Sequence, residues 1–270
     1  MSIRLVISDV DGTLVRSDKK LSPEVIAAVG RLQDAGVPFT LISARPASGM
    51  LWIADALKLT HPMGAFNGGT IVKPDGAIVS AEHIDPAVAD KAIAMLVETK
   101  VALWLFAHGK WYAQDVANTH MDSERSSANA EPVMFRDASE VKGPFDKIVG
   151  VSDEHDFLAD LDKKVSAALG DGATVARSQV YYLDVTAPLA DKGHGIAALA
   201  KAHGLSLDEV AVLGDQRNDL PMFARAGFSV AMGQGPAEVR AAATRETRSN
   251  DEDGVAHAID EILLPMIGAK

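Results

Sequence analysis

Leu5-Val6-Ile7-Ser8-Asp9-Val10-Asp11-Gly12-Thr13 joins a short apolar run to two acids, a glycine and a threonine. Such a run predicts a buried strand of a parallel sheet that ends in a polar loop. Ser22-Pro23-Glu24 then predicts the start of a helix that ends at Gly36, and residues 38–42 predict a second strand. Together these elements form a βαβ unit, whose loops lie at the carboxyl edge of the sheet, where open α/β sheets bind ligands.

The same pattern returns near the end of the chain, where residues 210–213 and 228–232 are apolar and lead into glycine-containing loops. The intervening part predicts a hairpin over 69–84, a helix over 86–99 and strands over 101–107, 111–114, 147–151 and 179–184. We therefore predict an α/β fold. Residues 1–83 and 187–270 would form a doubly wound, mostly parallel, Rossmann-like sheet, and residues 84–186 an inserted α/β domain.

The composition limits the partners more than the chemistry. With 26 basic and 37 acidic residues the formal charge is −11, which argues against nucleic-acid binding and against adsorption to an anionic membrane. A local cluster of lysine, backbone N–H groups and a metal ion can still hold a phosphate. The chain has no cysteine, no signal-peptide pattern at its start and no apolar stretch near the roughly 20 residues of a membrane span. We expect a cytoplasmic protein, a monomer or a weak homodimer, that acts on a small molecule.

Asp9 and Asp11 are separated by one residue at the end of the first strand. On an extended backbone both carboxylates point to the same face, and Gly12 allows the chain to turn sharply. Two acids this close repel each other unless a cation or a proton intervenes, and a divalent metal is one solution. The alternative is that Asp11 and Gly12 form an ordinary turn while Asp9 caps a helix. For an isolated pair of acids this alternative is favoured.

Three other sites change that judgement. Ser43 follows the second strand, Lys192 opens a helix pattern, and Asp215 follows a later strand with Asn218-Asp219 close behind. Taken singly, these residues fit a helix cap, a solvated surface lysine and a boundary of secondary structure. Taken together, they place a hydroxyl, a cation and more acids at successive strand ends of one sheet edge.

These segments resemble the four motifs of the haloacid dehalogenase superfamily: Asp9-Val10-Asp11-Gly12-Thr13-Leu14, Ser43-Ala44-Arg45, Lys192 and Gly214-Asp215-Gln216-Arg217-Asn218-Asp219. The order of parts is similar to that of its Cof-type phosphatases, which carry a large C2-type cap domain between the second and third motifs. Phe66-Asn67-Gly68-Gly69 and Asn250-Asp251-Glu252-Asp253-Gly254-Val255-Ala256 also look similar to segments of that group. The resemblance covers essentially the whole chain and implies that residues 84–186 form a cap that selects the substrate.

The resemblance implies a Mg²⁺-dependent phosphatase that hydrolyses small phosphorylated metabolites such as sugar phosphates. Asp9 would be the nucleophile, forming an aspartyl-phosphate, and Asp11 would act as acid and then as base. The implied metal ligands are Asp9, the backbone carbonyl of Asp11, and Asp215, while Asp219 would hold the metal's water shell or orient Lys192. The implied phosphate-binding residues are Gly12, Ser43, Ala44, Lys192 and Asn218.

Two residues near the motifs have open roles. Arg45 would reach the substrate or the cap, or would pair with a surface acid. Asn67 would bind substrate or cap a turn. The departures from the family pattern are mild, because Ser43 keeps the hydroxyl of the commoner Thr, while Gln216-Arg217 is bulkier than usual and would narrow the metal side.

Within the insert we expect packing rather than chemistry. The aromatic residues fall in predicted strands and should fill a sheet face rather than line a pocket; they are Trp104, Trp111, Tyr112, Tyr181 and Tyr182. The Ser-rich segment 122–129 predicts a solvated connection rather than a site. The histidines at 83, 108 and 120 have no metal-ligand spacing and should be structural or solvated.

Two other functions remain open from the sequence. A sugar-phosphate mutase would use the same residues but would yield an isomerised sugar phosphate instead of free phosphate. A non-catalytic, receiver-like phospho-switch also joins clustered acids, a lysine and a doubly wound sheet. Such a switch needs no long insertion near its middle, which favours an enzyme.

Overall fold

The first sheet is built around β1 (Leu5–Ser8), whose four residues are all buried. The computed structural model describes residues 3–114 and 118–268. The strand order is β14 (Arg245–Glu246), β13 (Phe228–Ala231), β12 (Val210–Gly214), β1 and β2 (Phe39–Leu41), and neighbouring strands are parallel. This arrangement confirms the predicted parallel sheet.

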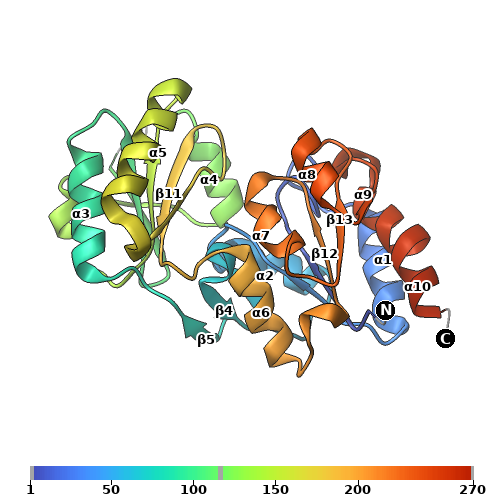
Figure 1. Cartoon of the computed structure of the whole chain (residues 1–270). Coiled ribbons are helices and arrows are strands. Elements are labelled where there is room, and N and C mark those ends of the chain that lie inside the picture. The colour runs from blue at the N-terminus through green and yellow to red at the C-terminus, as the bar shows by residue number, and fades with distance from the viewer. Residues whose placement is uncertain (1–2, 115–117, 269–270) are drawn as a thin grey trace.

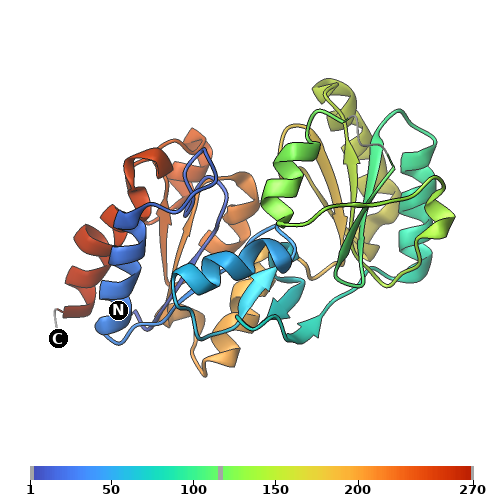
Figure 2. The same cartoon turned by 180° about the vertical axis from the view of Figure 1, so that it is seen from behind.

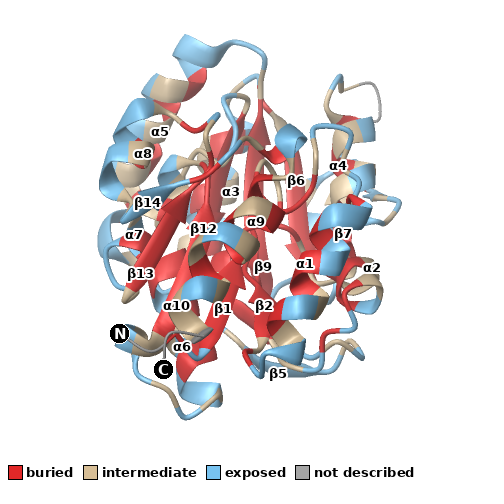
Figure 3. Ribbon diagram, turned by 90° about the vertical axis from the view of Figure 1, so that its right-hand side faces the viewer, coloured by how far each residue is buried: buried red, intermediate tan, exposed pale blue. Residues whose placement is uncertain are grey.

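Helices cover both faces of this sheet, as a doubly wound fold requires (Figure 3). One face packs against α1 (Pro23–Asp34), α2 (Ser48–Ala56) and α9 (Gly254–His257), which is followed by α10 (Leu264–Gly268). The other packs against α6 (Lys192–Ala202), α7 (Leu220–Phe223) and α8 (Ala237–Ala242). Val6 and Leu213 belong to the first face, and Ile7 and Val212 to the second, because successive strand residues point to opposite sides. No described helix has the length and apolar character that crossing a membrane requires.

Helix α1 begins where the sequence predicts. The Ser22 hydroxyl accepts a hydrogen bond from the backbone N–H of Val25 at 3.1 Å, and Pro23 occupies the first turn. After the helix the chain turns at Gly36, whose φ of 79° suits a glycine.

The strand order reverses next to β1. From β1 the chain crosses to β2 on one side, and it later returns through β12, β13 and β14 on the other. The carboxyl ends of β1 and β12 therefore flank a topological switch point, where α/β sheets bind ligands. Asp9 and Asp215 directly follow these two strands.

A small antiparallel sheet leads away from this first lobe. It consists of β3 (Met63–Ala65), β4 (Thr70–Val72) and β5 (Ile78–Ala81). The backbone N–H of Lys73 donates to the carbonyl of Ala77 at 2.9 Å, closing the turn predicted at this place. A parallel bridge between Ile42 and Gly64 joins the small sheet to the end of β2.

A second lobe lies beside the first, and both are visible from opposite sides in Figures 1 and 2. Its sheet has the order β10 (Thr174–Ala176), β11 (Tyr182–Thr186), β9 (Phe145–Val151), β6 (Ala102–Ala107), β7 (Lys110–Ala113) and β8 (Val133–Met134). The pairs are antiparallel, except that β7 and β8 are parallel. These strands all fall within the insert predicted over 84–186. The exact division into domains stays a prediction, and residues 1–2 and 269–270 of the first domain lie outside the described part.

The two faces of the second sheet have different neighbours. Leu103 and Leu105 pack with α3 (Pro86–Val97) and α5 (His155–Leu169). Trp104 and Phe106 point the other way, into a hydrophobic cluster that continues into the first lobe. Helix α4 (Met121–Ala128) lies on this inner side, next to α2 (Figure 1).

The aromatic residues of the insert divide between the two faces of the second sheet. Core packing is confirmed for Trp104 and Trp111, which are almost fully buried and lie edge to face with ring centroids 5.2 Å apart. Tyr112 packs partly buried on the outer face. Tyr182 is buried in the same hydrophobic cluster as Trp104 and Tyr181 packs against that cluster, as predicted, but both also line a cavity between the lobes, which was not predicted.

Two local predictions in the insert were wrong. Residues 122–129 are not a solvated connection, because α4 occupies most of them and its Glu124 is buried. The helix is short and polar, so no apolar period marks its buried side in the sequence. The strand predicted over 179–184 is displaced to β11, because a turn bond from the N–H of Tyr182 to the carbonyl of Gln179 delays its start.

Candidate active site

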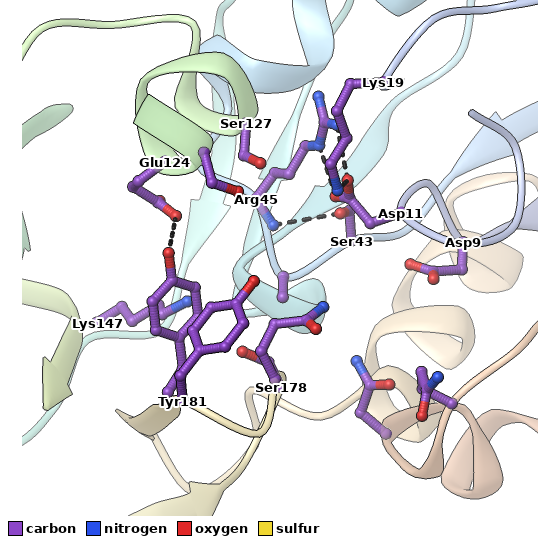
Figure 4. A pocket seen from close by; sticks show the side chains of 16 residues that line it. Asp9, Asp11, Lys19, Ser43, Arg45, Glu124, Ser127, Lys147, Ser178 and Tyr181 are labelled. Atoms are coloured by element: carbon purple, nitrogen blue, oxygen red, sulfur yellow. Dashed lines mark hydrogen bonds and ion pairs between the residues drawn. The ribbon is translucent and has the colours of Figure 1, made fainter. Parts of the chain in front are cut away.

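Four segments bring predicted site residues to one edge of the first sheet. Asp9 follows β1, Ser43 lies just beyond β2, Asp215 follows β12, and Lys192 begins α6. A cavity lined by both lobes lies at this edge (Figure 4). The first lobe lines it with Asp9, Asp11, Lys19, Ser43, Ala44, Arg45, Gln216 and Asn218. The second lobe lines it with Ser123, Glu124, Ser127, Lys147, Ser178, Gln179, Tyr181 and Tyr182.

Lys192 is a buried cation between two carboxylates. Its Nζ lies 2.6 Å from Oδ1 of Asp9 and 2.5 Å from Oδ1 of Asp219. Burial alone would lower the pKa of Lys192, but Asp219 and Asp9 together raise it, so the side chain stays charged. The alternative of a solvated surface lysine is therefore wrong.

Asp219 uses both of its oxygens inside the protein. While Oδ1 contacts Lys192, Oδ2 accepts hydrogen bonds from the backbone N–H groups of Asp215 at 2.7 Å and Gln216 at 2.8 Å. Gly214 is needed for this arrangement, because a Cβ there would lie 2.5 Å from the Asp219 carboxylate. Asp219 was predicted either to hold the water shell of the metal or to orient Lys192. These contacts support the second role.

Three carboxylates offer a place for a divalent cation. Oxygen atoms of Asp9, Asp215 and Asp219 all lie within 4.8 Å of one another. Gly12, at a φ of 78°, leaves room for this group, since a Cβ there would come 2.4 Å from Oδ2 of Asp215. The Thr13 hydroxyl donates to the other oxygen of Asp215 at 2.9 Å and so fixes its orientation. Oxygen ligands of this kind fit Mg²⁺ and other hard divalent ions.

Without a divalent cation, the negative charges of these three carboxylates repel one another. Burial raises the pKa of Asp9 well above its usual value; Lys192 opposes the shift, and Asp219 and Asp215 add to it. Burial, followed by the charge of Asp219, raises the pKa of Asp215 to about 6. A divalent cation would relieve this repulsion directly.

Asp11 has different partners from Asp9. Its carboxylate accepts hydrogen bonds from Nε and Nη2 of Arg45 at 2.7 and 2.8 Å and from Nζ of Lys19 at 2.6 Å. Burial would raise the pKa of Asp11, but the bonds and charges of Arg45 and Lys19 outweigh it and hold that pKa well below its usual range. Both acids line the cavity, yet Asp9 contacts Lys192 whereas Asp11 contacts Arg45 and Lys19. Figure 4 shows Asp11 beside Arg45 and Lys19, with Asp9 apart from them.

Arg45 does not pair with a surface acid. Its side chain is buried in the cavity wall, and besides the bonds to Asp11 its Nη1 donates to the carbonyl of Gly49 at 3.1 Å. Lys19 escaped the sequence analysis, because nothing in its neighbours shows that the chain doubles back over Asp11. It sits at a φ of 65°, in a tight turn closed by a bond from its N–H to the carbonyl of Arg16.

The remaining predicted residues divide into two groups. Ser43, Ala44 and Asn218 line the cavity. Gly12 and Asn67 are not among the described residues that line it. Asn67 is buried, and its N–H donates to the carbonyl of Ser43 at 2.7 Å, which places it behind the cavity wall as a support for the loop after β2.

The loop after β1 is tied to the segment near the end of the chain. The Asn250 amide donates to the carbonyl of Val15 at 3.0 Å, and Arg16 donates to both carboxylate oxygens of Asp253 at 2.8 Å. These contacts hold the turn that carries Lys19, and they give a structural reason for the acidic segment 250–256.

Comparison with known proteins agrees with this geometry. The sequence model of the haloacid dehalogenase-like hydrolases matches residues 6–259. A Haemophilus influenzae protein that is provisionally named a phosphatase is 30% identical over 262 residues, covering 97% of this chain and 98% of that protein. The 5-amino-6-(5-phospho-D-ribitylamino)uracil phosphatase YwtE of Bacillus subtilis is 27% identical, with 97% and 98% coverage. The crystal structure of a haloacid dehalogenase-like hydrolase from Bacteroides thetaiotaomicron superposes with a TM-score of 0.86 at 26% identity, covering 97% of this chain and 100% of that one.

Proposed function

We propose a mechanism and a substrate class from the premise that the chain belongs to the haloacid dehalogenase-like hydrolases and is a phosphoric monoester hydrolase acting on small phosphorylated substrates. The mechanism assigns Asp9 as a nucleophile in a Mg²⁺-assisted displacement at phosphorus. The observation that carries it is the environment of Asp9, which lies 2.6 Å from the buried cation of Lys192 and in the same acidic group as Asp215 and Asp219.

Asp9, Asp215 and the backbone carbonyl of Asp11 would hold the metal, with Asp219 behind them. When bound, Mg²⁺ would supply charge neutralisation between an ester dianion and an anionic nucleophile. The number of buried carboxylates exceeds what Lys192 alone can balance, which supports the assignment of a divalent cation to this place.

In the first step a carboxylate oxygen of Asp9 attacks the phosphorus, and the bond from phosphorus to the ester oxygen breaks. The product on the protein is an aspartyl-phosphate, which divides one difficult displacement into two easier ones. The leaving oxygen takes a proton from the Asp11 carboxyl, so this step needs the protonated form of Asp11, which Arg45 and Lys19 disfavour in the described structure. Lys192, the Ser43 hydroxyl, the Asn218 amide and the N–H groups at Gly12 and Ala44 stabilise the charge on the transferred group.

In the second step water attacks the phosphorus of the aspartyl-phosphate. The Asp11 carboxylate takes the proton from that water, the bond to Asp9 breaks, and inorganic phosphate leaves. Arg45 and Lys19 favour the ionised form of Asp11, which is the form that this step uses.

The substrate class we propose is sugar and polyol phosphates. The cavity wall opposite Asp9 is rich in hydroxyl, amide and charged groups rather than apolar ones. A relative of similar length is named for a phosphorylated ribityl compound, which is a polyol phosphate. Residues 84–186 would form the cap domain that selects such substrates and excludes water during the first step.

The test is phosphate release from p-nitrophenyl phosphate and from a panel of sugar phosphates, with Mg²⁺ and with EDTA. We expect turnover that EDTA abolishes and that Asp9→Asn lowers by at least about 10³-fold. Asp34→Asn, an exposed acid at the end of α1, is the matched control and should keep full activity. Undiminished hydrolysis by Asp9→Asn would rule out this nucleophile, and an isomerised sugar phosphate in place of free phosphate would indicate a mutase.

A further inference from the structure

We propose that Glu124 and Lys147, on the wall of the second lobe, bind neighbouring hydroxyl groups of an uncharged, polyhydroxylated leaving group. Glu124 would accept from one hydroxyl, and Lys147 would donate to the next. This inference rests on the proposed phosphatase function and adds the residues that choose among phosphate esters. Tyr182 acts through Glu124 and is a positioning residue.

The two residues come from different elements and meet on one wall. Glu124 lies on α4 and Lys147 on β9, and both line the same cavity as Asp9 (Figure 4). Glu124 is 7% exposed and Lys147 is 6% exposed. Charged side chains this deeply buried are rare unless other groups compensate for the loss of water.

Within the described residues, that compensation is incomplete. The Glu124 side chain accepts one hydrogen bond, from the Tyr182 hydroxyl at 3.2 Å, although a carboxylate can accept about four. Lys147 has one ionic partner, Asp184 at 3.2 Å, although an ammonium group has three donors. A ligand in the cavity can use the remaining capacity, and this is how a binding site rejects ligands that lack the matching groups.

The charges on this wall favour a neutral ligand. Asp184 is buried, and its oxygens have no hydrogen-bonding partner in the described part of the chain, so it needs the charge of Lys147. Glu124 adds a second acid nearby, and burial raises its pKa while Lys147 opposes that shift. The wall therefore carries no excess positive charge for a second phosphate or a carboxylate on the leaving group.

The remaining contacts also suit a sugar or polyol rather than an apolar group. Tyr181 stacks on His120 with ring centroids 3.7 Å apart, which fixes a flat surface beside the polar pair. Ser127, Ser178 and Gln179 add hydroxyl and amide groups to the same wall. An acid and an ammonium group on one wall complement two hydroxyls of one ligand, since each hydroxyl both donates and accepts.

The experiment compares kcat/KM for three esters: a hexose 6-phosphate, the corresponding hexose 1,6-bisphosphate and p-nitrophenyl phosphate, whose leaving group has no second hydroxyl. Glu124→Gln keeps the size of the side chain and removes its charge. We expect it to lower kcat/KM for the hexose 6-phosphate on the order of 10- to 100-fold and to leave p-nitrophenyl phosphate within about threefold. Glu131→Gln, an exposed glutamate just beyond α4 that pairs with Arg125, is the matched control and should change neither.

The possible results separate this inference from the proposed function. Equal losses on the hexose phosphate and on p-nitrophenyl phosphate would overturn the role of Glu124 while leaving the phosphatase intact. A wild-type preference for the bisphosphate would overturn the neutral-ligand argument. Absence of Asp9-dependent hydrolysis of every ester would instead overturn the proposed function. If Glu124→Gln does not fold, deoxyhexose 6-phosphates with the wild-type enzyme give the same test, and unchanged kcat/KM for every deoxy position would overturn the inference.

Discussion

The edge of the first sheet and the wall of the second lobe face each other across one cavity. They differ in how far their buried charged side chains find partners within the protein. At the edge, Lys192 and Asp219 contact each other and Asp219 also accepts hydrogen bonds from two backbone N–H groups, so these side chains are fixed before any ligand arrives. On the wall, Glu124 and Lys147 are also buried but have few partners among the described residues. The edge is preorganised for one reaction, whereas the wall gains its hydrogen bonds from whatever binds.

This difference separates chemistry from selection. Changes at the edge should affect every phosphate ester alike, because the phosphoryl group is common to all of them. Changes on the wall should alter the ranking of esters, because only the leaving group meets it. The following experiments test whether the two regions behave separately.

Gly12→Ala should cause the largest loss of activity, and this loss should be the same for every ester. The new Cβ would lie 2.4 Å from Oδ2 of Asp215, so the carboxylate that we propose as a metal ligand must move. We expect kcat/KM to fall at least about 100-fold for every ester, and Mg²⁺ binding measured by calorimetry to weaken in parallel. Gly36→Ala is the matched control, because its φ of 79° imposes the same backbone strain with nothing within 4 Å of the new Cβ. A loss confined to sugar phosphates would contradict the separation.

Gly49→Ala should disturb the contact between the regions. A Cβ at Gly49 would lie 1.9 Å from the carbonyl oxygen of Ser127, so α4 must retreat from α2 and carry Glu124 with it. The Ser48 hydroxyl, which donates to the carbonyl of Ala128 at 2.6 Å, would lose that bond. We expect a fall in kcat/KM on the order of 10-fold, larger for sugar phosphates than for p-nitrophenyl phosphate. Gly30→Ala on α1 is the control, because nothing lies within 4 Å of its new Cβ. An equal loss of kcat/KM for sugar phosphates and p-nitrophenyl phosphate would mean that α4 does not take part in substrate selection.

The same division decides how much the sequence predicts. Asp9 and Asp215 directly follow short apolar strands, and Ser43 comes two residues after the last residue of β2. These three residues can be located from the sequence because parallel strands end at a common edge of the sheet. The neighbours of Glu124 are polar, and its burial depends on β9 and β11, which come later in the chain. Lys19 meets Asp11 only because Asn250 and Asp253 hold its turn in place. Contacts that depend on distant segments leave no local pattern.

Protons and Mg²⁺ should compete at the edge. Burial and Asp219 raise the pKa of Asp215 to about 6, above its ordinary value of 3.8. The folded protein therefore holds this proton more tightly than the unfolded chain. The resulting stability is fully present below about pH 4 and is lost as the pH rises through about 6, which costs the metal-free protein on the order of 2–3 kcal/mol.

The measurement is the melting temperature with EDTA and with Mg²⁺. Because the cation replaces the proton, Mg²⁺ should raise the melting temperature by several degrees at about pH 7.5 and by much less at about pH 5. Asp215→Asn should lower both the pH dependence and the response to Mg²⁺. An equal rise at the two pH values would indicate that the metal does not bind at this carboxylate.

Lys19→Met should cause the smallest loss of activity, because Asp11 is bound by Arg45 as well as by Lys19. Arg45 makes two hydrogen bonds to Asp11 from a side chain that is 2% exposed, whereas Lys19 makes one from a side chain that is 32% exposed and therefore partly screened by water. We expect kcat to fall by no more than about fivefold for all esters alike, while Arg45→Met, which removes the buried partner, should cost on the order of 100-fold. Parallel kcat measurements on the two variants decide the matter. If Lys19→Met were as damaging as Arg45→Met, the turn after β1 would be part of the reaction machinery and not only a support for Asp11.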